Sequence, residues 1–227
     1  MRRIYSTLFL VVIIMSGVCT VTAQANVLGF ATTAFSDDEI SAIISSISLE
    51  SSTVDSAKAG IYCFDVRQDG VYALAFGMGA NSRISVYDSD STFLYGYAFN
   101  SNGVYRIAFQ EDSIAIYFLR GNVIVTFDPA GVCIDVQKVM STKQNDLHVD
   151  ELLDRTHKNI AAKEYSMERD FEIGDAYSRF VVVNELGERT ILYDASAEHE
   201  VGQFLLLASL IVFFALVILG VWKKHVK

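Results

Sequence analysis

The sequence contains few cysteines and no arrangement of residues typical of a metal site or a catalytic centre. Three cysteines occur among the 227 residues, and none has the spacing of metal ligands. There is no G-x-S-x-G segment, and no cysteine is placed for a catalytic triad. We therefore expect a protein that is not an enzyme and that uses no metal or cofactor.

Positive charge is scarce in the middle of the chain. All 27 acidic residues lie between Asp37 and Glu200. Five of the 18 basic residues stand at the two ends, which leaves 13 for the middle part and gives it a net charge of −14. Such a domain repels phosphate backbones, so we expect no nucleic-acid partner and no docking on anionic lipid.

Two cysteines, Cys63 and Cys133, belong to this middle part, and their state has two readings. In an exported domain they could form a disulfide. Both lie in apolar segments of strand character, residues 61–64 and 132–134, where a free thiol packs as a small hydrophobic group. This context favours two free thiols and leaves the disulfide open.

The N-terminus has the three parts of a secretory signal. Arg2 and Arg3 precede an apolar run over residues 8–15, and an A-x-A site ends at Ala25. We predict a signal peptide over residues 1–25 that is cut after Ala25. The alternative is an uncleaved anchor, because residues 4–23 are just long enough to span a membrane.

The C-terminal part contains an apolar run without charge over residues 204–222. A run of this length crosses a hydrocarbon core of about 30 Å as a helix. We predict a linker over residues 195–202 and a transmembrane helix over residues 203–222. Lys223 and Lys224 follow the run, and the positive-inside rule places the tail of residues 223–227 in the cytoplasm and the domain outside the plasma membrane.

Residues 26–60 form an N-terminal segment in which one short helix is predicted. Ser36 and Glu39 have the spacing of a capping box. Isoleucines over residues 40–47 recur at helical spacing, which predicts a helix near residues 37–46.

From residue 61 onward, apolar residues alternate with a period of two, which predicts strands. A first unit has predicted strands at 61–66, 71–76, 83–87 and 93–99. About 40 residues later the plan recurs at 104–109, 114–118, 123–127 and 132–136, with Asp128 in the place of Asp88. Such a repeat is typical of propeller blades or stacked β-meanders, although β-sandwiches have similar spacings.

The last part of the domain predicts a partial third unit. A helical insertion at 145–159 is followed by strands at 163–168, 179–183 and 189–193. The predicted fold is therefore mainly β over residues 61–194, with two four-stranded propeller-blade-like meander repeats, a partial third, two short helices and one C-terminal transmembrane helix. Two or three blades cannot close a propeller, so the repeats pack on themselves or are completed by another chain.

Several segments carry a resemblance to a known group of proteins. They are Cys63-Phe64-Asp65-Val66, Val86-Tyr87-Asp88-Ser89, Phe93-Leu94-Tyr95-Gly96-Tyr97 and Ile116-Tyr117-Phe118-Leu119-Arg120. Over residues 61–194 the chain resembles uncharacterised exported proteins of gut Firmicutes that have blade-like β repeats and a C-terminal membrane anchor. The N-G-N turn of that group is replaced here by residues 90–92. The resemblance implies topology and a bacterial source, and it implies no activity.

Three groups of residues resemble sites, and each has a simpler explanation. Residues 88–91 alternate oxygen ligands like a calcium loop, but the central glycine and the final glutamate are missing, which favours a polar turn. His148 and His157 are nine residues apart, too far for a zinc pair on one helix. The aromatic residues at odd positions over 93–99 share one strand face, and we expect them in the core rather than in a strip that binds sugars or peptides.

The sequence favours an extracytoplasmic binding, sensing or interaction module. Its partners are the lipid bilayer, through the C-terminal helix, and a membrane or cell-surface protein, because the tail is too short to signal alone; a homo-oligomer is a further possibility. The alternative is a membrane-anchored hydrolase of cell-wall or glycan substrates. Location and abundant carboxylates favour it, but no spacing singles out Asp65 or Glu111-Asp112 as acid–base groups.

Overall fold

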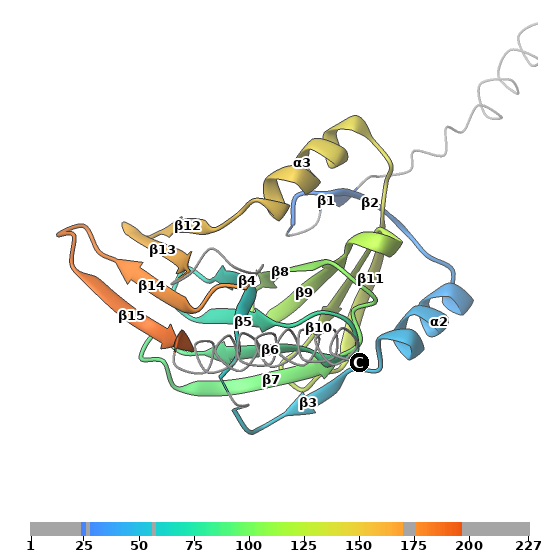
Figure 1. The fold of residues 1–227 in the computed structure, drawn as a ribbon. Coiled ribbons are helices and arrows are strands. Elements are labelled where there is room, and N and C mark those ends of the chain that lie inside the picture. Colours follow the sequence, from blue (N-terminus) through green and yellow to red (C-terminus); the bar gives the residue numbers. More distant parts are fainter. Residues whose placement is uncertain (1–23, 26–27, 56–57, 170–175, 197–227) are drawn as a thin grey trace, which may run out of the picture.

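The computed structural model describes residues 24–25, 28–55, 58–169 and 176–196, which form three antiparallel sheets and two α-helices (Figure 1). The predicted mainly-β fold is confirmed for this part of the chain. Nearly all of the predicted signal peptide, the transmembrane helix and the tail lie outside the described residues. Within the described ranges, no helix is long and apolar enough to cross a bilayer.

The first sheet is an antiparallel meander with one extra strand on its outer edge. Its consecutive strands are β4 (Ile61–Val66), β5 (Tyr72–Phe76), β6 (Ser82–Tyr87) and β7 (Phe93–Phe99). Strand β3 (Glu50–Ser52) pairs with β7, so the order is β3-β7-β6-β5-β4. A short 3-10 helix, η1 (Gly79–Asn81), joins β5 to β6. All four predicted strands are confirmed to within one residue at each end.

The second sheet repeats this plan. Its consecutive strands are β8 (Tyr105–Gln110), β9 (Ser113–Phe118), β10 (Val123–Phe127) and β11 (Cys133–Val139), with η2 (Leu119–Gly121) between β9 and β10. The N-terminal strand β2 (Ala31–Ala34) pairs with β11, and β1 (Gln24–Ala25) pairs with β2. Because β1 lies within the predicted signal peptide, cleavage after Ala25 would leave β2 as the outer edge.

The third sheet corrects the prediction of a partial unit. It is a complete four-stranded meander of β12 (His157–Ile160), β13 (Lys163–Glu168), β14 (Arg179–Val183) and β15 (Arg189–Asp194). The predicted helical insertion at 145–159 was too long at its C-terminal end. Helix α3 (Lys143–Leu153) ends earlier, and β12 follows it. Strand β12 was not predicted because its four residues, of which only Ile160 is buried, show too little apolar alternation.

The predicted capping-box helix is confirmed as α2 (Asp37–Ile47). The Glu39 carboxylate accepts the Ser36 backbone N–H at 2.9 Å. Three acidic residues occupy the first turn, where their negative charge interacts favourably with the positive end of the helix dipole. The isoleucine stripe rests on the core between the first and second sheets. The segment also contains β2 and β3, which the sequence analysis did not predict.

The three sheets are stacked with the first sheet in the middle, although the chain runs through them in the order first, second, third (Figure 1). One apolar cluster fills the space between the third and first sheets and includes Phe180, Phe64 and Tyr72. A second cluster fills the space between the first and second sheets and includes Tyr97 and Ile116. The repeats therefore pack face to face.

The outer face of the second sheet is covered by α3 and by the segment before β2. A third apolar cluster joins Leu152 of α3 and Phe30 to Ala115 and Ile124 of the sheet. The buried amide of Asn145 ties α3 to the start of β2, since it donates to the Ala31 carbonyl at 2.9 Å and accepts the Ala31 N–H at 3.1 Å. Helix α3 thus covers the second sheet and carries the chain back toward the first.

Strand β5 is apolar throughout because it is covered on both faces. Tyr72, Leu74 and Phe76 face the third sheet, whereas Ala73 and Ala75 face the second. All five are buried because both faces of the strand are covered. The alternation of large and small side chains permits the second sheet to lie close on one side while bulky rings fill the other.

The hairpin between the third and fourth strands has the same structure in all three sheets. In each, one side-chain oxygen accepts backbone N–H groups two and four residues further on, at 2.8 to 3.0 Å. The accepting residues are Asp88, Asp128 and Asn184. The fourth residue of each turn, Ser91, Gly131 and Gly187, has a positive φ of 64°, 85° and 78°. Three copies of one turn support an internal threefold repeat.

The aromatic residues of β7 are mostly core, as predicted, but they do not share one face. Tyr97 and Phe99 are buried between the first and second sheets, and Tyr95 packs against the same cluster. A bulge between β6 and β7 shifts the register, so that Phe93 turns to the other face and packs against Tyr87, with ring centroids 5.9 Å apart. The bulge is the physical reason for this difference.

Both cysteines in the described part of the chain are free thiols, so the disulfide between Cys63 and Cys133 is not formed in the structure. Each packs in a strand environment, Cys63 buried beside the Tyr105 carbonyl and Cys133 half-buried beside that of Asp135. Burial raises the pKa of the Cys63 thiol to about 11, which keeps it protonated near neutral pH.

We expect the fold to lose stability in alkaline solution. Burial raises the pKa of Tyr97 and Tyr105 above the ordinary value of 10.0, and that of Tyr72 to about 12. Because the folded state holds these protons more tightly, its stability is full below about pH 9 and falls as the pH rises from 10 to 12. The urea midpoint measured by circular dichroism should be constant from pH 7 to 9 and then decrease. A constant midpoint up to pH 12 would contradict this.

Candidate functional site

The three sheets meet at a buried carboxylate, Asp65, on the edge strand β4 of the middle sheet. Its Oδ2 accepts the backbone N–H of Phe109 in β8 at 2.8 Å. Its Oδ1 accepts a hydrogen bond from Lys158 Nζ of β12 at 2.7 Å, and this lysine also donates to the Val66 carbonyl at 2.8 Å. One carboxylate therefore joins the first strands of all three meanders.

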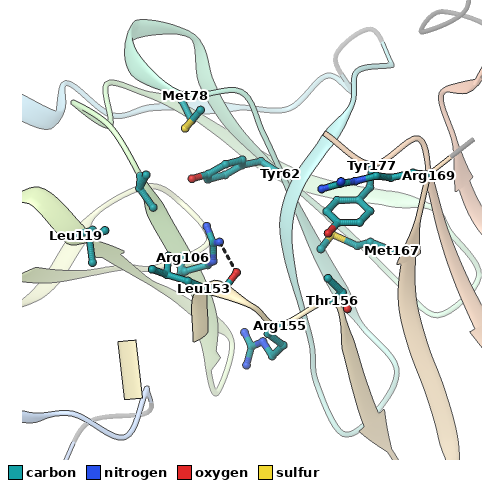
Figure 2. A pocket seen from close by; sticks show the side chains of 11 residues that line it. Tyr62, Met78, Arg106, Leu119, Leu153, Arg155, Thr156, Met167, Arg169 and Tyr177 are labelled. Atoms are coloured by element: carbon teal, nitrogen blue, oxygen red, sulfur yellow. Dashed lines mark hydrogen bonds between the residues drawn. The ribbon is translucent and has the colours of Figure 1, made fainter. Parts of the chain in front are cut away.

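A cavity of about 320 Å³, which we call the junction cavity, is lined by Arg155, whose guanidinium lies 3.6 Å from this carboxylate. Figure 2 shows the residues of its wall. The first and second sheets, the segment from α3 to β12 and the third sheet all contribute to its wall. The lining residues are Tyr62, Met78, Val104, Arg106, Leu119, Leu153, Arg155, Thr156, Met167, Arg169 and Tyr177. Its volume is within the range of small-molecule sites. Three arginines in the wall contrast with the acidity of the whole domain.

Arg106 projects from β8 into the junction cavity (Figure 2). Its guanidinium donates to the carbonyls of Leu152, Leu153 and Tyr105 at 3.1, 2.8 and 2.8 Å. Two of these carbonyls belong to the last turn of α3, which has no basic residue of its own, so Arg106 supplies the positive charge that a helix C-terminus favours. The guanidinium also lies over the Tyr62 ring, 5.1 Å from its centroid.

The other two arginines come from the parts of the wall nearest the third sheet. Arg155 reaches the Asp65 carboxylate at 3.6 Å and the Phe64 and Ile107 carbonyls at 3.5 and 3.4 Å, all through Nη2. Arg169 lies over the Tyr177 ring at 4.2 Å. Two of the three arginines thus lie over the two tyrosine rings of the wall, which places cationic groups and flat aromatic surfaces side by side.

Apart from Asp65, which pairs with Arg155 of the wall, the candidate site residues from the sequence lie outside the junction cavity. In residues 88–91 the Asp88 carboxylate is occupied by the hairpin turn, as the prediction of a polar turn requires. His148 packs on Phe30 and contacts the Leu28 carbonyl, whereas His157 is exposed on β12. Within the described ranges no group of three or more His, Cys, Asp or Glu side chains is arranged to hold a metal ion.

The junction cavity was not predicted from the sequence. Its residues are distributed from 62 to 177, and the strands that carry them meet only when the third sheet packs against the first. One residue of the junction does have a recognisable signal in the sequence. Asp65 interrupts the apolar strand β4, and a charged residue at a buried strand position needs partners. The other two carboxylates considered, Glu111 and Asp112, are both exposed, and Asp112 pairs with Arg67.

No protein-family model and no curated protein matches the chain.

Proposed function

We propose that the chain is a membrane-tethered binding module that captures a small ligand in the junction cavity on the outer side of the plasma membrane. The observation that carries this proposal is the cavity itself. Arg106, Tyr62 and Tyr177 direct polar and aromatic groups into a space formed by all three sheets. The export signal and the C-terminal apolar run supply the location and the tether.

The proposed module is not an enzyme. Glycan hydrolysis needs two carboxyl groups that face one bond. Among the described residues, none that lines the junction cavity is an Asp or Glu, and the neighbouring Asp65 is held by Lys158 and by the Phe109 N–H. The alternative of an anchored hydrolase therefore has less support than a binding role.

Two finer proposals concern assembly. The three meanders resemble propeller blades, with β4, β8 and β12 as inner strands around the junction. A closed propeller needs more blades than three, but α3 already covers the outer face of the second sheet. We therefore propose that a partner, either a second copy of this chain or another membrane or cell-surface protein, packs on the third sheet.

Ligand binding in the junction cavity can be tested by filling it. Met78 lines the cavity, and 46% of its surface is exposed, so Met78→Trp adds bulk at the opening with little effect on the core. We expect the wild-type full-length chain in mild detergent to be stabilised by at least one member of a panel of sugars, amino acids, organic acids and short peptides. Met78→Trp should abolish that thermal shift.

A matched control is Ser46→Trp, which adds the same side chain at the exposed edge of a separate cavity beside α2. This variant should bind like the wild type. If no panel member stabilises the wild type, or if both tryptophan variants bind equally well, the proposed role of the junction cavity is wrong.

A further inference from the structure

From the charges and the lining of the junction cavity we infer that its ligand is a small organic oxyanion. This inference rests on the proposed binding function and specifies the chemical class of the ligand. The class comprises carboxylates and phosphate monoesters that carry an apolar or ring-shaped carbon frame. Guanidinium groups match the geometry of both oxyanions, and tyrosine rings suit the frame.

The first argument is the charge of Arg106. Its three hydrogen-bond acceptors are neutral backbone carbonyls, and it forms no ion pair in the described part of the chain. A guanidinium has five N–H donors, so two more remain for a ligand. Its role at the end of α3 accounts for its position but does not neutralise its charge.

The second argument is the balance of charge around Asp65. Lys158 contacts this carboxylate at 2.7 Å, and Arg155 lies 3.6 Å from the same oxygen. Within the described ranges these are the ion pairs of all three residues, so one carboxylate serves two cations. With Arg106, the junction has three cations for one carboxylate and an excess of two positive charges. Two of these cations, Arg106 and Arg155, line the cavity, although the net charge of the domain is −14.

The third argument is the apolar lining, which distinguishes an organic anion from an inorganic one. Met78, Val104, Leu119, Leu153 and Met167 contribute apolar surface to the wall. Inorganic phosphate would leave this surface exposed to water, whereas a carbon frame would cover it. The overall negative charge also opposes polyanions much more than a ligand with one or two charges.

The test compares charged and neutral probes that share a carbon frame. The wild-type full-length chain in uncharged detergent is titrated with benzoate, phenyl phosphate, glucuronate and inorganic phosphate, and with the neutral counterparts benzyl alcohol and glucose. We expect at least one organic anion to bind, its neutral counterpart and inorganic phosphate to bind at least tenfold more weakly, and affinity to fall as salt rises. Carboxylate and phosphate probes distinguish the two members of the class.

The arginines provide the matched variants. Arg106→Gln should weaken binding of the anion roughly tenfold to a hundredfold, the effect of losing a charge-assisted hydrogen bond. Arg155 has longer contacts than Arg106, so its loss disturbs the fold less than the loss of Arg106. Arg155→Gln should also weaken binding of the anion. Arg83→Gln is the control, since it removes equal charge from β6 outside the cavity and should bind normally.

The outcomes separate this inference from the proposed function. If a neutral probe or panel compound binds in a way that Met78→Trp abolishes, and Arg106→Gln and Arg155→Gln bind it normally, the anion inference is overturned and the binding module stands. If Arg83→Gln weakens anion binding as much as the cavity variants, the effect is long-range charge and the inference is also overturned. If nothing binds in the cavity, both proposals fail.

Discussion

Replacing Asp65 by Asn should lower the free energy of unfolding by about 3 kcal/mol, the low end of the range for breaking one member of a buried ion pair. The reason is that Lys158 and Arg155 would remain at the junction without their carboxylate. The low end applies because the Lys158 side chain is 27% exposed and retains some water. Urea unfolding of the full-length chain, followed by far-ultraviolet circular dichroism, measures the change.

The control for this prediction is Asp112→Asn. Asp112 also pairs with an arginine, but its side chain is 81% exposed, and exposed pairs contribute about 1 kcal/mol or less. The double variant Asp65→Asn with Lys158→Met should recover part of the loss, since it removes the unpaired lysine. Equal effects of Asp65→Asn and Asp112→Asn would show that the junction carboxylate has no special role in holding the sheets together.

The second large effect is expected at Phe180, in the centre of the third sheet. Phe180 is fully buried, and its ring lies 4.9 Å from that of Phe64, 5.2 Å from that of Tyr72 and 6.1 Å from that of Tyr165. Phe180→Ala should reduce the free energy of unfolding by about 3–5 kcal/mol. The surrounding rings belong to two different sheets, so they cannot move together to fill the space that the phenyl ring leaves. Hydrogen exchange should show the third sheet opening before the other two.

Leu186→Ala is the matched control for the third sheet. Leu186 is in the hairpin between β14 and β15 and is 84% exposed, so its truncation should change stability by less than about 0.5 kcal/mol. If Phe180→Ala destabilised all three sheets together, with no early exchange in the third, the third sheet would not be a separable unit.

Local structure could be predicted wherever the pattern along the chain is long enough. The strands at 61–66 and 93–99 alternate over six or seven residues, and the helix at 37–47 has both a capping box and an apolar stripe. The strands at 31–34 and 50–52 have three or four small and polar residues, and their pairing with β11 and β7 stabilises them. The residues of such a short strand do not indicate that a distant strand will pair with it.

The arrangement of the sheets could not be predicted for a different reason. The repeat suggests that neighbours in sequence are neighbours in space, and this holds for the first and second sheets. The third sheet packs on the far side of the first because α3 covers the free face of the second. The junction cavity follows from that packing, so neither Arg106 nor Arg155 could be identified as a site residue from its surroundings in the sequence.

The pairing of β2 with β11 has a consequence for the time course of folding. Thr32 lies opposite Val139, more than 100 residues later, so this early part of the chain must wait during synthesis for a partner that follows much later. Closing so long a loop is entropically costly and slow. Until β11 arrives, the early segment is an unpaired strand that can join a neighbouring chain. The interval before this pairing is therefore when newly made chains are most open to misassembly.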